Sequence, residues 1–176
     1  MRRTWMIGAL VVAALAVASI ALASGLHHGH GRFGARLTGF NEVPPILSNG
    51  KASVRVTING TSLTYQLSLS GTFSSTITQS HLHFAQPGVN GAVFLFLCTN
   101  LGNGPAGTPA CPQSGTVTRT VSTADLLGVP SQNIHAGNFD DVVRIIRSGD
   151  AYANVHTVNF PAGEIRGQVT VHFEHH

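Results

Sequence analysis

The sequence predicts an all-β fold, a β-sandwich or barrel of about eight short strands with one or two short helices. Three observations carry this prediction. Most segments alternate apolar and polar residues, which is the period of a half-buried strand. Sequences rich in glycine, proline and asparagine separate these segments at short intervals, as turns do in sandwiches and barrels. The 176 residues suffice for one domain core and contain no internal repeat.

The first four strands are justified by alternation and by the residues that end them. In residues 51–58, alanine and valine alternate with polar residues, which predicts a half-buried strand. Asn59-Gly60 favours a tight hairpin turn, so residues 61–69 are expected to return beside that strand. Proline lacks the N–H that a strand ladder needs, so it ends a strand. The other two expected strands are residues 36–40, before Pro44-Pro45, and residues 77–84, before the turn-forming residues 86–91.

The second half of the domain is expected to hold four more strands and the helical segments. Residues 92–97 are continuously apolar, as in a strand buried on both faces. Ser122 is suited to cap one helical turn, and Asn138 to cap a short helix over residues 139–147. The remaining expected strands are residues 115–121, 151–156 and 164–173.

The N-terminal residues 1–23 are typical of a secretory signal peptide. Arg2 and Arg3 precede an apolar run that ends in Ala21-Leu22-Ala23, a small-x-small cleavage site. An uncleaved membrane anchor is the alternative, because the run is near the shortest length that spans a bilayer. We expect export to the periplasm, the cell surface or the medium, and no membrane span after cleavage. The expected divisions are a signal peptide at 1–23, a His-rich flexible arm at 24–33, a β domain at 34–173 and a tail at 174–176.

The two cysteines predict a disulfide, and the charge balance argues against one class of partner. Cys98 and Cys111 flank a loop-like segment, and in an oxidising compartment such a pair favours a disulfide. Without Arg2 and Arg3 the chain is close to neutral and has a single lysine, so we do not expect a nucleic-acid partner.

The same alternation gathers polar side chains onto one side of three segments. Since side chains repeat every second residue in a strand, these residues are expected to face away from the core. If the three strands share a sheet, the polar residues lie on one surface. They are His81 and His83; Tyr152, Asn154 and His156; and Glu164 and Arg166.

Three interpretations of this polar face remain open. His81, His83 and His156 could ligate copper or zinc, with Glu164 or Asn154 accepting the other ring N–H of a ligand. Alternatively, the polar groups form a hydrogen-bonded structural network, or a patch for a small ligand or an extracellular protein. Glu42 precedes Pro44-Pro45 in a loop from which its carboxylate could reach the face, or it is a turn residue.

The chemistry of a hydrolase is not supported, because the sequence has no nucleophile-elbow motif. The sequence therefore favours a non-enzymatic binding or envelope module. A periplasmic copper- or zinc-binding protein is the alternative function.

Several motifs, in order, resemble the CHRD domain, the module named from chordin and found in exported bacterial proteins. The resemblance covers about residues 35–171 and implies an extracellular, immunoglobulin-like or Greek-key β-sandwich without a settled catalytic activity. The segment that ends in Cys111-Pro112 resembles the bacterial exported single-domain branch. The matching motifs are residues 37–45, His81-Leu82-His83, Gly88 with Asn90-Gly91, residues 152–157 and residues 161–168.

Overall fold

The computed structural model describes residues 30–171, which form eight strands, one α-helix and three short 3-10 helices. The expected signal peptide, residues 24–29 of the expected arm and the tail lie outside the described residues. The all-β class is confirmed, and no helix within residues 30–171 is long and apolar enough to cross a membrane. In chain order the elements are β1 (Gly31–Leu37), η1 (Gly39–Asn41), β2 (Asn49–Asn59), β3 (Ser62–Thr72), β4 (Ile77–Phe84), β5 (Ala92–Thr99), β6 (Gly115–Val121), η2 (Thr123–Asp125), η3 (Pro130–Gln132), α1 (Phe139–Ser148), β7 (Ala151–Thr157) and β8 (Ile165–Val171).

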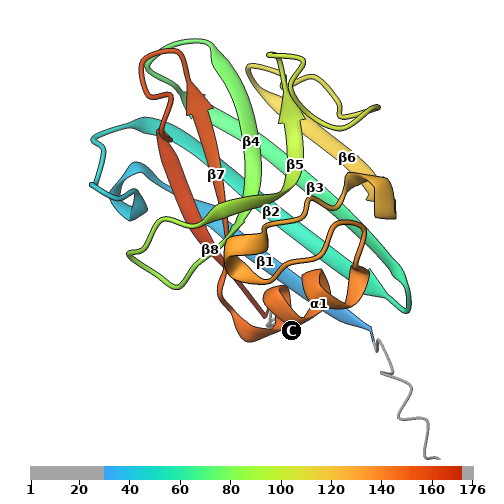
Figure 1. Cartoon of the computed structure of the whole chain (residues 1–176). Helices are drawn as coiled ribbons and strands as arrows, with labels where there is room; N and C mark the ends of the chain where they lie inside the picture. The colour runs from blue at the N-terminus through green and yellow to red at the C-terminus, as the bar shows by residue number, and fades with distance from the viewer. Residues whose placement is uncertain (1–29, 172–176) are drawn as a thin grey trace, which may run out of the picture.

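The strands form one antiparallel sheet in the order β5-β4-β7-β8-β1-β2-β3-β6. The sheet bends so that β4, β5, β7 and β8 lie across β1, β2, β3 and β6, and its shape is nearly that of a barrel (Figure 1). One buried cluster of apolar side chains from both halves fills the space between them. The Tyr65 hydroxyl of β3 donates to the Leu97 carbonyl of β5 at 2.6 Å across this core. The strands therefore form one continuous sheet, close to the barrel alternative, and the immunoglobulin-like or Greek-key sandwich is not confirmed.

The junction between β8 and β1 makes the sheet continuous. β8 pairs with β1 through Phe33–Val171 and Gly34–Thr170, and an isolated bridge joins Thr38 to Arg166. A Cβ at Gly167 would lie 2.3 Å from the Arg36 carbonyl oxygen, closer than real Cβ contacts. Glycine at this position therefore allows the two backbones to approach.

The expected first strand was misplaced. Residues 36–40 were expected to be extended, but β1 spans Gly31–Leu37 and residues 39–41 form η1. The strand starts earlier because Phe33, Ala35 and Leu37 alternate inward and pack in the core. The end of the expected arm is therefore part of the sheet. The other seven strands lie within a few residues of their expected places.

Both expected helix caps are present. The Asn138 side chain accepts hydrogen bonds from the backbone N–H groups of Asp140 and Asp141 at the start of α1. Ser122 and Asp125 form a capping box at η2. The apolar residues of α1 join the core cluster, so the helix covers one end of the space between the sheet halves.

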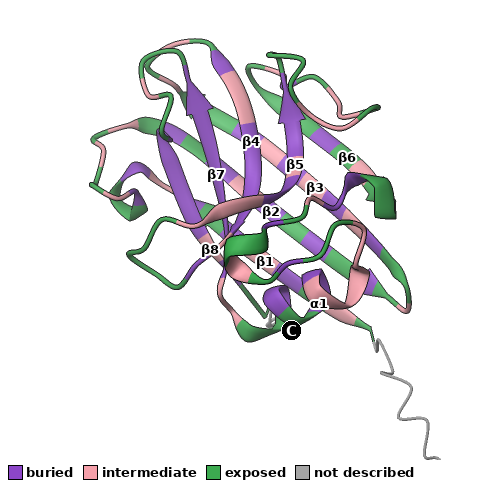
Figure 2. Ribbon diagram, viewed as in Figure 1, coloured by how far each residue is buried: buried purple, intermediate pink, exposed green. Residues whose placement is uncertain are grey.

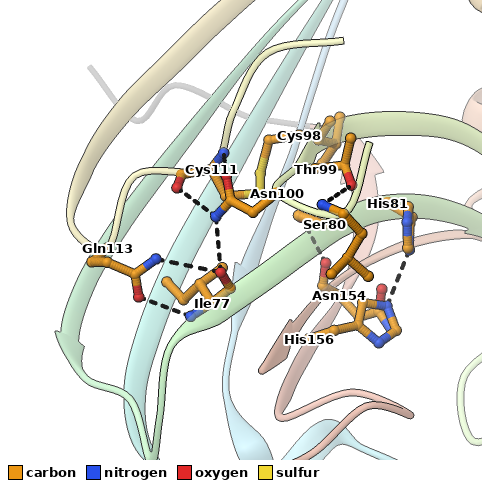
Figure 3. Close-up of a disulfide and its surroundings, with 12 residues drawn as sticks. Ile77, Ser80, His81, Cys98, Thr99, Asn100, Cys111, Gln113, Asn154 and His156 are labelled. Atoms are coloured by element: carbon orange, nitrogen blue, oxygen red, sulfur yellow. Dashed lines mark hydrogen bonds between the residues drawn. A yellow bond between two sulfur atoms is a disulfide. The ribbon is translucent and has the colours of Figure 1, made fainter. Parts of the chain in front are cut away.

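The expected disulfide joins Cys98 in β5 to Cys111, with 5.0 Å between the two Cα atoms (Figure 3). Asn100 ties the enclosed loop to the sheet, because its amide donates to the carbonyls of Ile77 and Cys111. The Asn100 side-chain oxygen accepts from the Cys111 N–H in return. The disulfide thus closes the loop on β5, and Asn100 holds the loop against the start of β4.

Reduction of this disulfide is expected to lower the free energy of unfolding by about 3 kcal/mol, because it frees a closed loop in the unfolded chain. Urea unfolding with and without a phosphine reductant measures the loss. A Cys98→Ser, Cys111→Ser variant is the control, since the reductant should leave its unfolding curve unchanged. Coincident curves for the oxidised and reduced native protein would contradict the expectation.

Candidate metal centre

Strands β4, β7 and β8 are neighbours, and their register brings the polar residues together. His81 lies opposite Asn154 and His83 opposite Tyr152 in the β4–β7 pair. Asn154 in turn lies opposite Arg166 in the β7–β8 pair. The alternate side chains of these strands, including Leu82, Ala153, Val155 and Ile165, belong to the apolar core. The predicted separation of polar and apolar sides is therefore present in the structure.

The polar side is buried, which the sequence did not indicate. The exposed fractions of His81, His83 and His156 are 3%, 7% and 6%, and that of Arg166 is 2%. All seven residues of β7 are buried, and Figure 2 shows β7 in the buried colour, whereas β4 and β8 are buried only in part. Three connecting segments contact this side: Glu42 of residues 40–43 lies beside Asn154, residues 86–91 bond to His83 and Arg166, and Pro161 of residues 158–163 bonds to His156. The expected open polar surface is in fact a second, polar interior.

The three histidine rings converge within this polar interior. His81 Nδ1 lies 3.1 Å from His156 Nε2, as drawn in Figure 3. One nitrogen from each of His81, His83 and His156 lies within 4.8 Å of the other two. Two nitrogens bound to one tetrahedral zinc ion lie about 3.4 Å apart. The 3.1 Å separation of His81 Nδ1 and His156 Nε2 is already close to this value, and the His83 nitrogen needs to approach the other two by at most about 1.4 Å.

Backbone carbonyls fix the tautomers of two of the rings. His156 Nδ1 lies 2.9 Å from the Pro161 oxygen, and His83 Nδ1 lies 2.9 Å from the Gly91 oxygen. A carbonyl only accepts, so both Nδ1 atoms carry the proton and both Nε2 atoms present a lone pair. Metal-ligating histidines commonly donate their second N–H in this way.

One contact within the cluster joins two acceptors, and one ring nitrogen has no hydrogen-bond partner. His83 Nε2 lies 3.0 Å from Asn154 Oδ1, which joins two acceptors when the ring is neutral. Rotation of the Asn154 amide resolves this contact, and so does a cation that accepts both lone pairs. His81 Nε2 is buried and has no hydrogen-bond partner. A buried nitrogen without a partner is costly unless a ligand engages the ring.

Burial keeps the imidazoles neutral. Burial and, to a smaller extent, the neighbouring histidines lower the pKa of His81 to about 2 and the pKa of His156 to about 4, although the hydrogen bond to Pro161 opposes the shift at His156. Burial also lowers the pKa of His83, against the opposing effect of its hydrogen bonds to Gly91 and Asn154. Neutral rings are the form that binds metal, because a protonated nitrogen has no lone pair to offer.

An aromatic stack holds His83 in place. Tyr152 stacks on the His83 ring with 4.6 Å between centroids and 6° between planes. The Arg166 guanidinium lies 3.4 Å from the Tyr152 ring centroid, within cation–π range. Phe96 packs against His81 in an edge-to-face contact, with 4.3 Å between the ring centroids. Tyr152 and Arg166 therefore act on the cluster through packing.

Glu164 accepts hydrogen bonds from hydroxyl groups and a backbone N–H, as in the structural-network interpretation, and not from a histidine ring. Oε1 accepts from the Ser48 hydroxyl and the Ser74 N–H, and Oε2 accepts from the hydroxyls of Ser74 and Thr157, at 2.6 to 2.9 Å. Burial raises the pKa of Glu164, but these hydrogen bonds outweigh burial and hold the pKa below its usual value. All four hydrogen bonds of the carboxylate go to groups outside the three histidines, so its contacts are structural.

Glu42 lies against the polar interior, with its carboxyl beside Gly163. A Cβ at Gly163 would lie 2.6 Å from Glu42 Oε1 and 3.0 Å from Asn154 Nδ2. The backbone φ of +132° at Gly163 also disfavours other residues. Burial raises the pKa of Glu42 to about 7, although Arg166 opposes the shift, and Oε1 has no hydrogen-bond partner.

Sequence reasoning missed the groups that fix the ring orientations. The carbonyls of Gly91 and Pro161 carry no side-chain signal, and Phe96 belongs to an apolar run. The one signal that could have found them was that turn-forming segments follow β4 and β7. Such segments fold back over the strands that they connect.

A family model described as the CHRD domain matches residues 33–169, which is more than half of the chain. No curated protein and no solved structure matches the chain.

Proposed function

The chain belongs to the CHRD-domain family, and from this premise we propose that it is a binding module whose ligand is a copper or zinc ion. The proposed ligands are His81, His83 and His156. The observation that carries the proposal is the convergence of three buried, neutral imidazoles, two of which have backbone carbonyls fixing their lone pairs. This arrangement supports a preformed nitrogen site.

The donor set favours copper or zinc over other metals. Imidazole nitrogen suits zinc, copper, iron and nickel, whereas calcium and magnesium prefer oxygen. The described cysteines form the disulfide, so thiolate does not contribute. Three histidines leave a fourth position, which the Asn154 side-chain oxygen or a water molecule can fill.

We also propose that the protein is exported and acts at the periplasm, the cell surface or in the medium. The apolar N-terminal run with its cleavage motif supports this proposal, as does the disulfide. An envelope role for a metal-binding module follows from these two proposals together.

The decisive measurement is the metal content of a chain in which only the internal site can bind. The terminal histidines are replaced by serine, because clustered imidazoles also offer nitrogen ligands to a metal; they are His27, His28, His30, His172, His175 and His176. We expect this protein to bind one equivalent of Zn²⁺ or Cu²⁺, measured by elemental analysis after dialysis. The Cu²⁺ form should show nitrogen hyperfine coupling from imidazole in its electron paramagnetic resonance spectrum.

In the same background, His83→Ala is expected to lower metal affinity at least about a hundredfold, because it removes one of three ligands. His135→Ala is the matched control, since His135 is exposed and pairs with Asp141 away from the cluster. Urea unfolding checks that the His83 variant is folded, and His156→Gln provides a second test. Less than about a tenth of an equivalent in the parent, or equal losses from His83→Ala and His135→Ala, would exclude the site.

A further inference from the structure

A second candidate site lies beside the polar interior, in a cavity of about 330 Å³. It opens between the loop that follows η1 and the loop between β4 and β5, and β8 contributes Arg166 and Gln168 to its lining. The other lining residues used below are Phe40, Glu42, Val43 and Pro87. The cavity lining does not include the three histidines, so a ligand here is distinct from the proposed metal ion.

Arg166 brings a buried positive charge to this cavity. The residue is 2% exposed, and its side-chain hydrogen bonds are two long contacts of 3.3 Å to neutral acceptors, the Asn90 side-chain oxygen and the Gln86 carbonyl. Among the described residues, no carboxylate forms an ion pair with it. A guanidinium has five N–H donors and matches a carboxylate in a paired geometry. A buried cation without an anionic partner is costly, so Arg166 is suited to receive an anion.

Glu42 brings a second buried group to the same cavity. It is 6% exposed, Oε1 has no hydrogen-bond partner, and it forms no ion pair with Arg166 although both line the cavity. Oppositely charged side chains this deeply buried usually pair with each other. A ligand with an anionic group at one end and a donor at the other is suited to engage both residues, because both line the same cavity.

The size and the rim of the cavity narrow the class of ligand. A volume of about 330 Å³ is at the small end of ligand sites. Phe40 is 69% exposed at the cavity, with Val43 and Pro87 also in the lining. An exposed aromatic ring beside two polar anchors is suited to cover an apolar side chain.

We propose that this cavity binds a small zwitterion with an apolar side chain, of the size of an amino acid. The carboxylate of the ligand pairs with Arg166, its ammonium group donates to the Glu42 carboxyl, and its side chain packs on Phe40. The buried guanidinium then gains an anionic partner, and the Glu42 carboxyl gains a donor.

The test compares L-leucine with two analogues that each lack one charged group. Calorimetric titration of the full chain should give a Kd below about 1 mM for leucine. 4-Methylpentanoate lacks the ammonium group and 3-methylbutylamine lacks the carboxylate. Each analogue should bind at least about tenfold more weakly, because it leaves one buried charge without a partner.

Two variants test the contacts of the ligand's ammonium group and of its apolar side chain. A third variant separates this site from the metal site. Glu42→Gln should weaken leucine at least about tenfold but leave 4-methylpentanoate unchanged. Phe40→Ala alters an exposed side chain, so the fold is retained, and it should weaken leucine but not glycine. His156→Gln should bind leucine as the parent does, whatever its metal content. Absence of binding heat with leucine, equal affinities for the three compounds, or unaltered leucine binding by both the Glu42 and the Phe40 variant would overturn the proposal.

Discussion

Replacement of Glu164 by alanine is expected to lower the free energy of unfolding by about 4 kcal/mol. The residue is fully buried, and its carboxylate accepts four hydrogen bonds, from Ser48, Ser74 and Thr157. Ser48 directly precedes β2, Ser74 lies between β3 and β4, and Thr157 ends β7. The Glu164 side chain therefore joins three distant parts of the chain. Alanine leaves the buried donors without an acceptor and also leaves a cavity. Urea denaturation followed by circular dichroism measures the loss.

Three further variants separate the contributions to this loss of stability: one tests the charge of Glu164, and two test single donors to its carboxylate. Glu164→Gln keeps the shape without the charge and should lose about half as much stability. Ser48→Ala and Thr157→Val each remove one donor and should each cost about 1 kcal/mol. An alanine variant at 164 that unfolds within about 1 kcal/mol of the parent would show that this network contributes little.

Acidification of the metal-free protein is expected to lower its stability steeply from about pH 6.5 to about pH 4.5. The pKa of His81 falls from 6.5 to about 2 on folding and that of His156 to about 4, and the pKa of His83 falls as well. In this range the unfolded chain therefore binds protons that the folded chain does not, and stability is lost as the pH falls. Glu42 acts in the opposite direction, because its folded pKa of about 7 exceeds the ordinary value of 4.5. The net loss is about 2 kcal/mol per pH unit.

Urea unfolding at intervals of about half a pH unit, in the presence of a chelator, measures this slope. Glu42→Gln removes the opposing group and should steepen the slope by about 1.4 kcal/mol per pH unit. His81→Phe removes one of the groups that lose protons on folding and should flatten the slope by a similar amount. Stability that is constant or that rises as the pH falls through this range would contradict the buried neutral state of the histidines.

Much of the fold could be predicted because its signals are local. The alternation in residues 51–58 and the Asn59-Gly60 turn predict the β2–β3 hairpin without any tertiary information. The caps at Ser122 and Asn138 depend on residues within one turn of the helix. The first strand was misplaced because Gly31 and Gly34 weaken its alternation, and pairing with β2 and β8 makes up for that weakness.

Side-chain periodicity by itself determined which residues of β4, β7 and β8 face away from the apolar core, because that choice depends only on neighbours in the same strand. It thereby assigned His81, His83 and His156 to the same side of their strands. Only the tertiary structure decided that this side is buried, that carbonyls of Gly91 and Pro161 orient two of the rings, and that Glu164 bonds to hydroxyl groups. These outcomes depend on loops that fold over the sheet from distant parts of the chain, and a two-residue repeat contains no information about what covers a strand.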